Sequence, residues 1–180
     1  MAVSPTRNVL QRYFAGITEH AFMEHLGIGD APLTDYLAEM LTRFVHMDRL
    51  YVLHDVDGEK LTEVANMLIE AEGLPPESRT RREVFRHIGD YTLFWTGVYP
   101  EALRRLKHSS RMDHFIDYCS QGKRSYAIAS HTEDDHEDPV LKRLSDNFEL
   151  CAFGLNHVRK EFGHSGLAID EEGNVRRVIH

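Results

Sequence analysis

The stretch 84-VFRHIGDYTLFWTGVYPEALRRL-106 decides the fold, because it reads as a helix with no plainly polar side from Ile88 onward. At 3.6 residues per turn its side chains fall on three lines. One line is apolar and consists of Val84, Ile88, Tyr91, Trp95 and Val98, whereas a second is small and consists of Gly89, Thr92 and Thr96. The third line is mixed and consists of His87, Asp90, Phe94 and Gly97. A helix that is apolar nearly all round is buried, so we predict that it lies at the centre of a helical bundle.

The polar and small residues of this helix need a reason, because each of them is unfavourable in a helix core. A glycine costs about 1 kcal/mol relative to alanine in a helix, which the close approach of a neighbouring helix at Gly89 would offset. A carboxylate in an apolar setting must be paired or hydrogen-bonded. His87, one turn from Asp90, is one possible partner, and a tyrosine, an arginine or a helix N-terminus from elsewhere is another. Two interpretations follow: a buried polar clasp that fixes helix register, or one wall of a ligand pocket shared with Tyr91 and Trp95.

Further helices are predicted on both sides of this stretch from apolar residues at helical spacing. The predicted ranges are 8–26, 30–51, 61–73, 80–107 with a break at Pro100, 113–130, and a last long helix from 139 that includes Val158. Thr80 and Glu83 have the spacing of a capping box, and Asp30 and Asp138 are suited to cap the helices that follow them. We therefore predict an all-α fold: a single domain of about six helices over residues 1–162.

The segment 163–180 changes character. Its sequence around Glu172-Gly173-Asn174 is compatible with a hairpin, and equally with a disordered tail.

The composition excludes some classes of protein. A hydrophobic share of 42% and a charged share of 28% are ordinary for a soluble domain. The formal charge of -8 argues against a nucleic-acid binder, which needs a basic face. No apolar run approaches the roughly 20 residues of a membrane helix. Cys119 and Cys151 lie in apolar helical patterns and are interpreted as buried, reduced thiols, which together with the lack of a signal pattern predicts a cytoplasmic protein.

Two blocks of the sequence resemble a known family. The segment 89-GDYTLFWTGVYPE-101 resembles a G-D-x-x-L-F-x-x-G-x-x-P-E signature found in uncharacterised bacterial all-helical proteins. The segment 117-DYCSQGKRSY-126, with Ala129 after it, resembles a second block of the same family. The resemblance implies a helical fold and no particular reaction. It also suggests that Gly122 and Tyr126, one turn apart, form the surface that meets the helix of Asp90.

His54-Asp55 is the most enzyme-like motif. It resembles the adjacent His-Asp pair of the HD-domain metal phosphohydrolases, in which an upstream histidine and a downstream aspartate complete a divalent-metal site that activates water against a phosphate ester. In this sequence His20 or His25 would be the upstream ligand, and Asp113 or Asp117 the downstream one. The alternative is a histidine at a helix C-terminus followed by an Asp-Gly turn at residues 57–58.

Histidine is abundant, with twelve residues, which raises the further hypothesis of a pH-responsive regulator. Several of these histidines have an acidic neighbour. His157 and Glu161 form an i,i+4 pair, which usually gives a small surface stabilisation. The acidic segment 130–138 is interpreted as a solvated loop, because like charges placed this densely favour contact with water. It does not match a calcium loop, since it lacks the required glycine.

The sequence shows no complete catalytic set, and we assign no catalytic residue, no metal ligand and no cofactor. We predict a non-catalytic binding or interaction module with a small-molecule pocket along the central helix; the alternative is the HD-type phosphohydrolase. The expected partners are a second copy of the chain, another protein or a small molecule, and neither nucleic acid nor membrane. The predicted binding residues are His87, Asp90, Tyr91, Trp95 and Tyr126.

Overall fold

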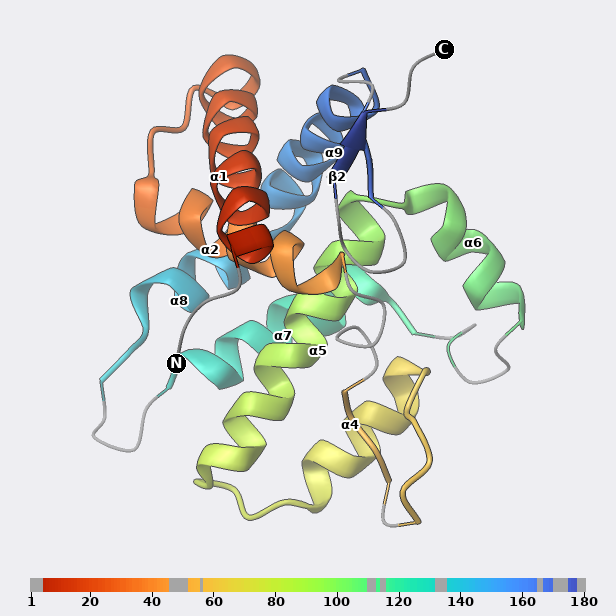
Figure 1. Cartoon of the computed structure of the whole chain (residues 1–180). Helices are drawn as coiled ribbons and strands as arrows, with labels where there is room; N and C mark the ends of the chain where they lie inside the picture. The colour runs from red at the N-terminus through yellow and green to blue at the C-terminus, as the bar shows by residue number, and fades with distance from the viewer. Residues whose placement is uncertain are drawn as a thin grey trace. The chain divides into compact units, whose positions relative to one another are not determined.

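The computed structural model describes residues 5–45, 52–55, 57–109, 113, 116–131, 136–164, 167–169 and 175–177. Over these residues it contains eight helices and two short strands (Figure 1). The helices are α1 (Pro5–Leu26), α2 (Ala31–Phe44), α4 (Val64–Gly73), α5 (Arg79–Gly97), α6 (Pro100–Ser109), α7 (Tyr118–Ser130), α8 (Pro139–Asp146) and α9 (Phe148–His164). The strands are β1 (Leu167–Ile169) and β2 (Val175–Arg177). The prediction of an all-α fold is confirmed, although the described residues form eight helices where about six were predicted.

The chain divides into two compact units. Unit 1 comprises residues 1–50 and 153–180, and unit 2 comprises residues 51–152. The predicted division into a helical domain over 1–162 and a tail over 163–180 remains a prediction. Within the tail, β1 and β2 pair in antiparallel register, with Ala168 opposite Arg176, so the hairpin interpretation holds for these two strands.

Unit 2 is organised around α5. This helix packs against α7, α4 and α6, and α7 in turn packs against α8 (Figure 1). Every residue from His87 to Trp95 is buried, as the sequence predicts for a helix without a polar side. Large side chains of the neighbouring helices, among them Tyr126 and Phe148, are also fully buried. The core of unit 2 therefore surrounds α5, the helix that carries four of the five predicted binding residues.

Unit 1 is built from α1, α2 and the part of α9 that begins at Phe153. Gly27 ends α1 with φ of 65°. Its N–H donates to the carbonyl of Met23 at 3.0 Å, which is the αL type of helix ending, and the N–H of Ile28 donates to the carbonyl of Phe22 at 3.1 Å. Asp30 then caps α2 by accepting from the N–H of Leu33 at 3.2 Å, as predicted.

Helices α1 and α9 pack closely within unit 1. The ring of Phe14 stacks on that of Phe162 at a centroid distance of 6.0 Å. A Cβ placed on Gly154 would lie 2.4 Å from Cε2 of Phe22, so the absence of a side chain at residue 154 is what lets this ring lie against α9.

Four predicted helix boundaries are wrong. The helix predicted from residue 61 begins at Val64. The cap of α5 is Ser78, whose hydroxyl accepts from the N–H of Arg81 at 3.2 Å, so the capping box of Thr80 and Glu83 does not start this helix. The helix predicted from residue 113 begins at Tyr118, because Asp117 caps it by accepting from two first-turn N–H groups. The last long helix is broken at Asn147, which leaves helical geometry and turns its amide back to the carbonyl of Arg143.

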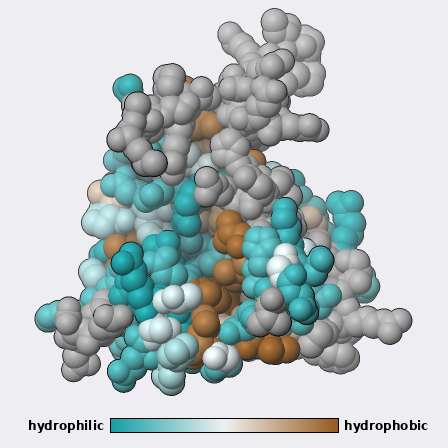
Figure 2. All heavy atoms as spheres, turned by 60° about the horizontal axis from the view of Figure 1, so that its bottom comes forward, coloured by the Kyte–Doolittle hydropathy of each residue, from teal (hydrophilic) through white to brown (hydrophobic). Residues whose placement is uncertain are grey.

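Among the described residues, no helix has the length and hydropathy needed to cross a membrane. Hydrophobic side chains do gather in a strip on the face shown in Figure 2, bordered by hydrophilic ones.

Candidate functional site

The predicted binding residue Asp90 is held by a tyrosine of the neighbouring helix. The hydroxyl of Tyr126 on α7 donates a hydrogen bond to Oδ1 of Asp90 at 2.8 Å, and both side chains are 0% exposed. This is one of the partners that the sequence allowed, and it links α5 to α7 at a single register. The polar clasp that the sequence offered as one interpretation of Asp90 is therefore present.

The small residues of α5 let α7 approach, as predicted. A Cβ on Gly89 would lie 2.7 Å from ring carbons of Tyr126, so this ring occupies the space that a side chain would need. On the facing helix, a Cβ on Gly122 would lie 2.6 Å from Oγ1 of Thr92 and 2.3 Å from Cε2 of Phe148. The two glycines thus set the separation of α5 and α7, and this close approach lets the hydroxyl of Tyr126 reach Asp90.

A second group of predicted binding residues forms a ladder of rings along α5. The ladder consists of the predicted residues His87, Tyr91 and Trp95 and of Tyr99, which follows the end of α5; each is four residues after the last, with Phe94 beside them. Successive ring centroids are 6.3, 6.2 and 6.1 Å apart, and Phe94 lies 5.5 Å from Trp95. Tyr91 also donates its hydroxyl to the carbonyl of Thr62 at 2.9 Å. We call this group the aromatic ladder.

The indole of Trp95 differs from its neighbours in one respect. Its side chain is only 8% exposed, yet Nε1–H has no hydrogen-bond partner in the part of the chain that the structure describes. An indole nitrogen is a donor only, and a buried donor that is left unpaired costs about 1–3 kcal/mol. Trp95 therefore offers an unused hydrogen bond inside an apolar, aromatic setting.

The five predicted binding residues fall into two groups. Asp90 and Tyr126 are joined by a hydrogen bond, whereas His87, Tyr91 and Trp95 are joined by ring contacts. Because consecutive residues of a helix are about 100° apart, the clasp and the ladder point in different directions from α5. The predicted binding residues therefore do not form one pocket wall. Asp90 and Tyr126 join α5 to α7, whereas His87, Tyr91 and Trp95 form a separate row of rings.

His54 and Asp55 lie in a tight turn. His54 pairs with Lys60 in an isolated antiparallel bridge, and Gly58 supplies a positive φ of 84° within the turn. Oδ1 of Asp55 accepts from the N–H groups of Asp57 at 2.9 Å and Glu59 at 3.0 Å. This carboxylate therefore stabilises the backbone of the turn, and the Asp-Gly turn that the sequence indicated is present.

Asp113, one of the candidate downstream ligands, has a structural role that sequence reasoning missed. It is buried, and its two carboxylate oxygens accept from the N–H groups of Val64 and Ala65, each at 2.9 Å. The hydroxyl of Tyr118 donates to the same carboxylate at 2.6 Å. Asp113 thus caps α4 from a distant part of the chain. Among the described residues, no group of three or more His, Cys, Asp or Glu side chains is placed to hold a metal ion.

One ion-pair network was also missed. Glu72, at the end of α4, accepts from Arg81 of α5 at 2.9 Å and from Arg124 of α7 at 2.8 Å. The hydrogen bond from Arg81 is the main reason that the pKa of Glu72 lies below its ordinary value. The sequence contains no local signal for this contact, because its three residues belong to three different helices.

Comparisons with protein-family models, with curated proteins and with solved structures find no match to this chain.

Proposed function

We propose that this protein is a non-catalytic helical binding module, and that it takes a small molecule against the aromatic ladder of α5. The observation that carries this proposal is the unpaired Nε1–H of Trp95, buried among aromatic rings. Ligand sites are mostly apolar and aromatic, with a few polar groups that orient the ligand. The ladder offers the rings, and Trp95 offers the polar group.

The chemistry of Trp95 defines the class of ligand. Because an indole nitrogen only donates, the ligand must present an acceptor, such as a carbonyl or carboxylate oxygen. The rings around it favour a flat or apolar body that packs at ring-contact distances. Tyr99, which is 38% exposed, is the end of the ladder that reaches solvent and hence the side from which a ligand enters. An aromatic carboxylate is the simplest molecule with both features.

The buried carboxylates of unit 2 support a non-catalytic role. Asp90 accepts from Tyr126, and both oxygens of Asp113 accept from donors of the fold itself. A general acid or base has to reach a proton of the substrate within hydrogen-bond distance. These two carboxylates instead hold helices together, and the proposed site contains a donor and rings.

Binding is tested with a panel of aromatic carboxylates, of which benzoate and indole-3-acetate are the first members. Trp95 is the sole tryptophan, so a ligand that reaches it changes the protein's indole emission. We expect a saturable change with at least one member of the panel. No saturable change with any member would refute the proposed ligand class.

The matched variant is Trp95→Phe, followed by calorimetry because the fluorophore is lost. Phenylalanine keeps an aromatic ring but removes the N–H, which has no partner in the described part of the fold, so the variant loses no internal hydrogen bond. A hydrogen bond to a charged group is worth about 1.5–3 kcal/mol, which corresponds to a loss of affinity of about 10-fold or more. Equal affinity in the variant would show that Nε1–H does not bind the ligand.

A further inference from the structure

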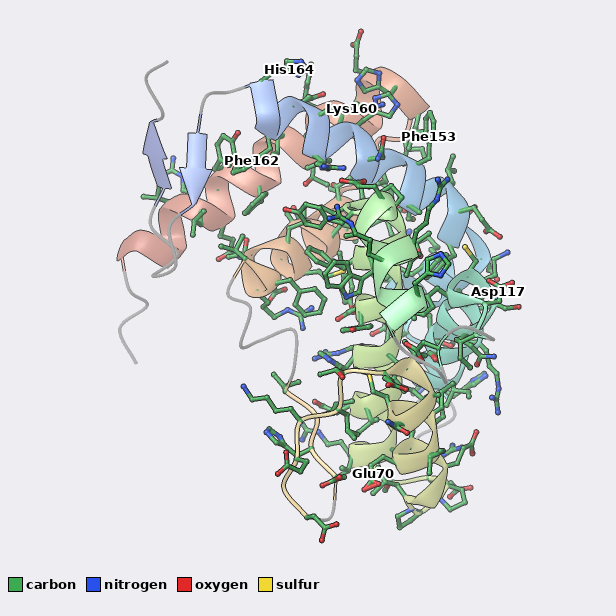
Figure 3. The ribbon with its side chains drawn as sticks, turned by 90° about the vertical axis from the view of Figure 1, so that its right-hand side faces the viewer. Glu70, Asp117, Phe153, Lys160, Phe162 and His164 are labelled. Carbon is green, nitrogen blue, oxygen red and sulfur yellow. The ribbon has the colours of Figure 1, made fainter. Side chains whose placement is uncertain are left out.

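A pair of histidines joins two helices of unit 1. His25 lies in the last turn of α1, and His157 lies on α9. Their rings are stacked, with centroids 3.9 Å apart and planes inclined by 23°. Phe153 of α9 packs its ring edge against His157 at 4.7 Å. Figure 3 shows Phe153 and Lys160 along α9, beside α1.

The pair accommodates one positive charge better than two. Nε2 of His25 lies 3.5 Å from Oε1 of Glu161, so this carboxylate is the ion-pair partner of a protonated His25. A second proton on His157 would place two like charges in adjacent, stacked rings. Among the described residues, the groups whose charges act on His157 are His25 from α1 and Lys160 and Glu161 from α9, and of these three only Glu161 is negative.

We propose that His25 and His157 form a pH-sensitive latch between α1 and α9, closed while His157 is neutral and opened when both imidazoles are protonated. The opening separates the last turn of α1 from the middle of α9, and these two helices also meet through Phe14 and Phe162. Unit 1 would then loosen at the histidine pair while the contact between Phe14 and Phe162 holds.

The closed latch requires a neutral His157, and this fixes how the stability of unit 1 depends on pH. Burial, and then the positive charges of His25 and Lys160, hold the pKa of His157 below its ordinary value, with Glu161 opposing them. The unfolded chain therefore takes up this proton first, at about pH 6.5. The latch stabilises unit 1 fully above that pH, and the stabilisation is lost as the pH falls through the lower pKa of the folded state.

The latch is tested by hydrogen exchange of the α1 and α9 amides at about pH 5.5 and pH 8, corrected for intrinsic exchange. We expect faster opening of the last turn of α1 and the middle of α9 at the lower pH. In parallel, the imidazole signals of His157 give its pKa in the folded protein. Each unit by which this pKa lies below about 6.5 corresponds to a tenfold increase in the opening equilibrium when both states are fully titrated.

Two variants separate the latch from general acid sensitivity. His157→Phe keeps an aromatic ring that does not titrate, and should remove the difference in opening between the two pH values. His20→Gln is the control, since His20 is exposed on α1 and makes no ring contact or ion pair among the described residues; it should keep the wild-type difference. An unchanged difference in His157→Phe would overturn the proposal. So would a wild-type His157 whose pKa is about 6.5 or higher, a result that does not depend on how the variant folds.

Discussion

Gly122→Ala tests whether the separation of α5 and α7 is set by the missing side chain. The new Cβ would meet Cε2 and Cζ of Phe148 at 2.3 and 2.5 Å and Oγ1 of Thr92 at 2.6 Å. Carbon atoms pack best at about 3.5–4.0 Å, so each neighbour would have to move by about 1 Å or more. Phe148 is 0% exposed, so any shift of its ring has to take place inside the core.

The net effect is the difference between two terms. Alanine is favoured over glycine in a helix by about 1 kcal/mol. Overpacking a core costs about 1–3 kcal/mol. The new Cβ would clash with Thr92 of α5 and with Phe148 of α9, so we expect a cost at or above the upper end of this range. We expect a net loss of about 2 kcal/mol in the free energy of unfolding, which for a chain of this size lowers the Tm by about 4–8 °C.

The assay is urea denaturation followed by Trp95 emission, which reports on unit 2. Gly73→Ala is the control in the same unit, because no atom lies within 4 Å of the Cβ it would add; its effect should stay within about 0.5 kcal/mol. Adding Phe148→Leu to Gly122→Ala should cost less than the sum of the two single changes, because a smaller side chain relieves the clash. A Gly122→Ala protein as stable as the wild type, or strictly additive costs, would refute the proposed packing.

Two further outcomes are expected. Tyr126→Phe should lower the free energy of unfolding by about 1.5–3 kcal/mol, measured by the same denaturation, because it removes a buried hydrogen bond to the carboxylate of Asp90; a loss below about 0.5 kcal/mol would show that the clasp contributes little. Elemental analysis of protein purified without a histidine tag or chelator should find no stoichiometric iron, manganese or zinc, because Asp55 and Asp113 accept from N–H groups of their own fold. Stoichiometric metal that is lost in His54→Ala would instead favour the phosphohydrolase.

The elements that could be predicted from the sequence are those governed by local chemistry. The burial of α5 could be predicted because its sequence has no polar side. The end of α1 could be predicted from Gly27, and the start of α2 from Asp30. The close approach at Gly89 also follows, because a glycine in a buried helix needs a neighbour to offset its cost. Each of these inferences uses residues within a few positions of one another.

The parts that could not be predicted depend on contacts between distant segments. The sequence offered several partners for Asp90, and only the packing of α7 selects Tyr126. Similarly, His157 and Glu161 look like an ordinary pair on one helix, whereas the fold places Glu161 next to His25 of α1. The break at Asn147 was missed because apolar spacing continues across it, so periodicity alone does not reveal two helices.

The cap of α4 by Asp113 has a consequence for the order of events during synthesis. The N–H groups of Val64 and Ala65 find their acceptor only 49 and 48 residues farther along the chain. Until residue 113 has been synthesised, these two N–H groups lack the acceptor that they have in the folded chain. The contact with Asp113 closes a loop that contains α5 and α6, so the start of α4 is capped only after both of these helices have been synthesised.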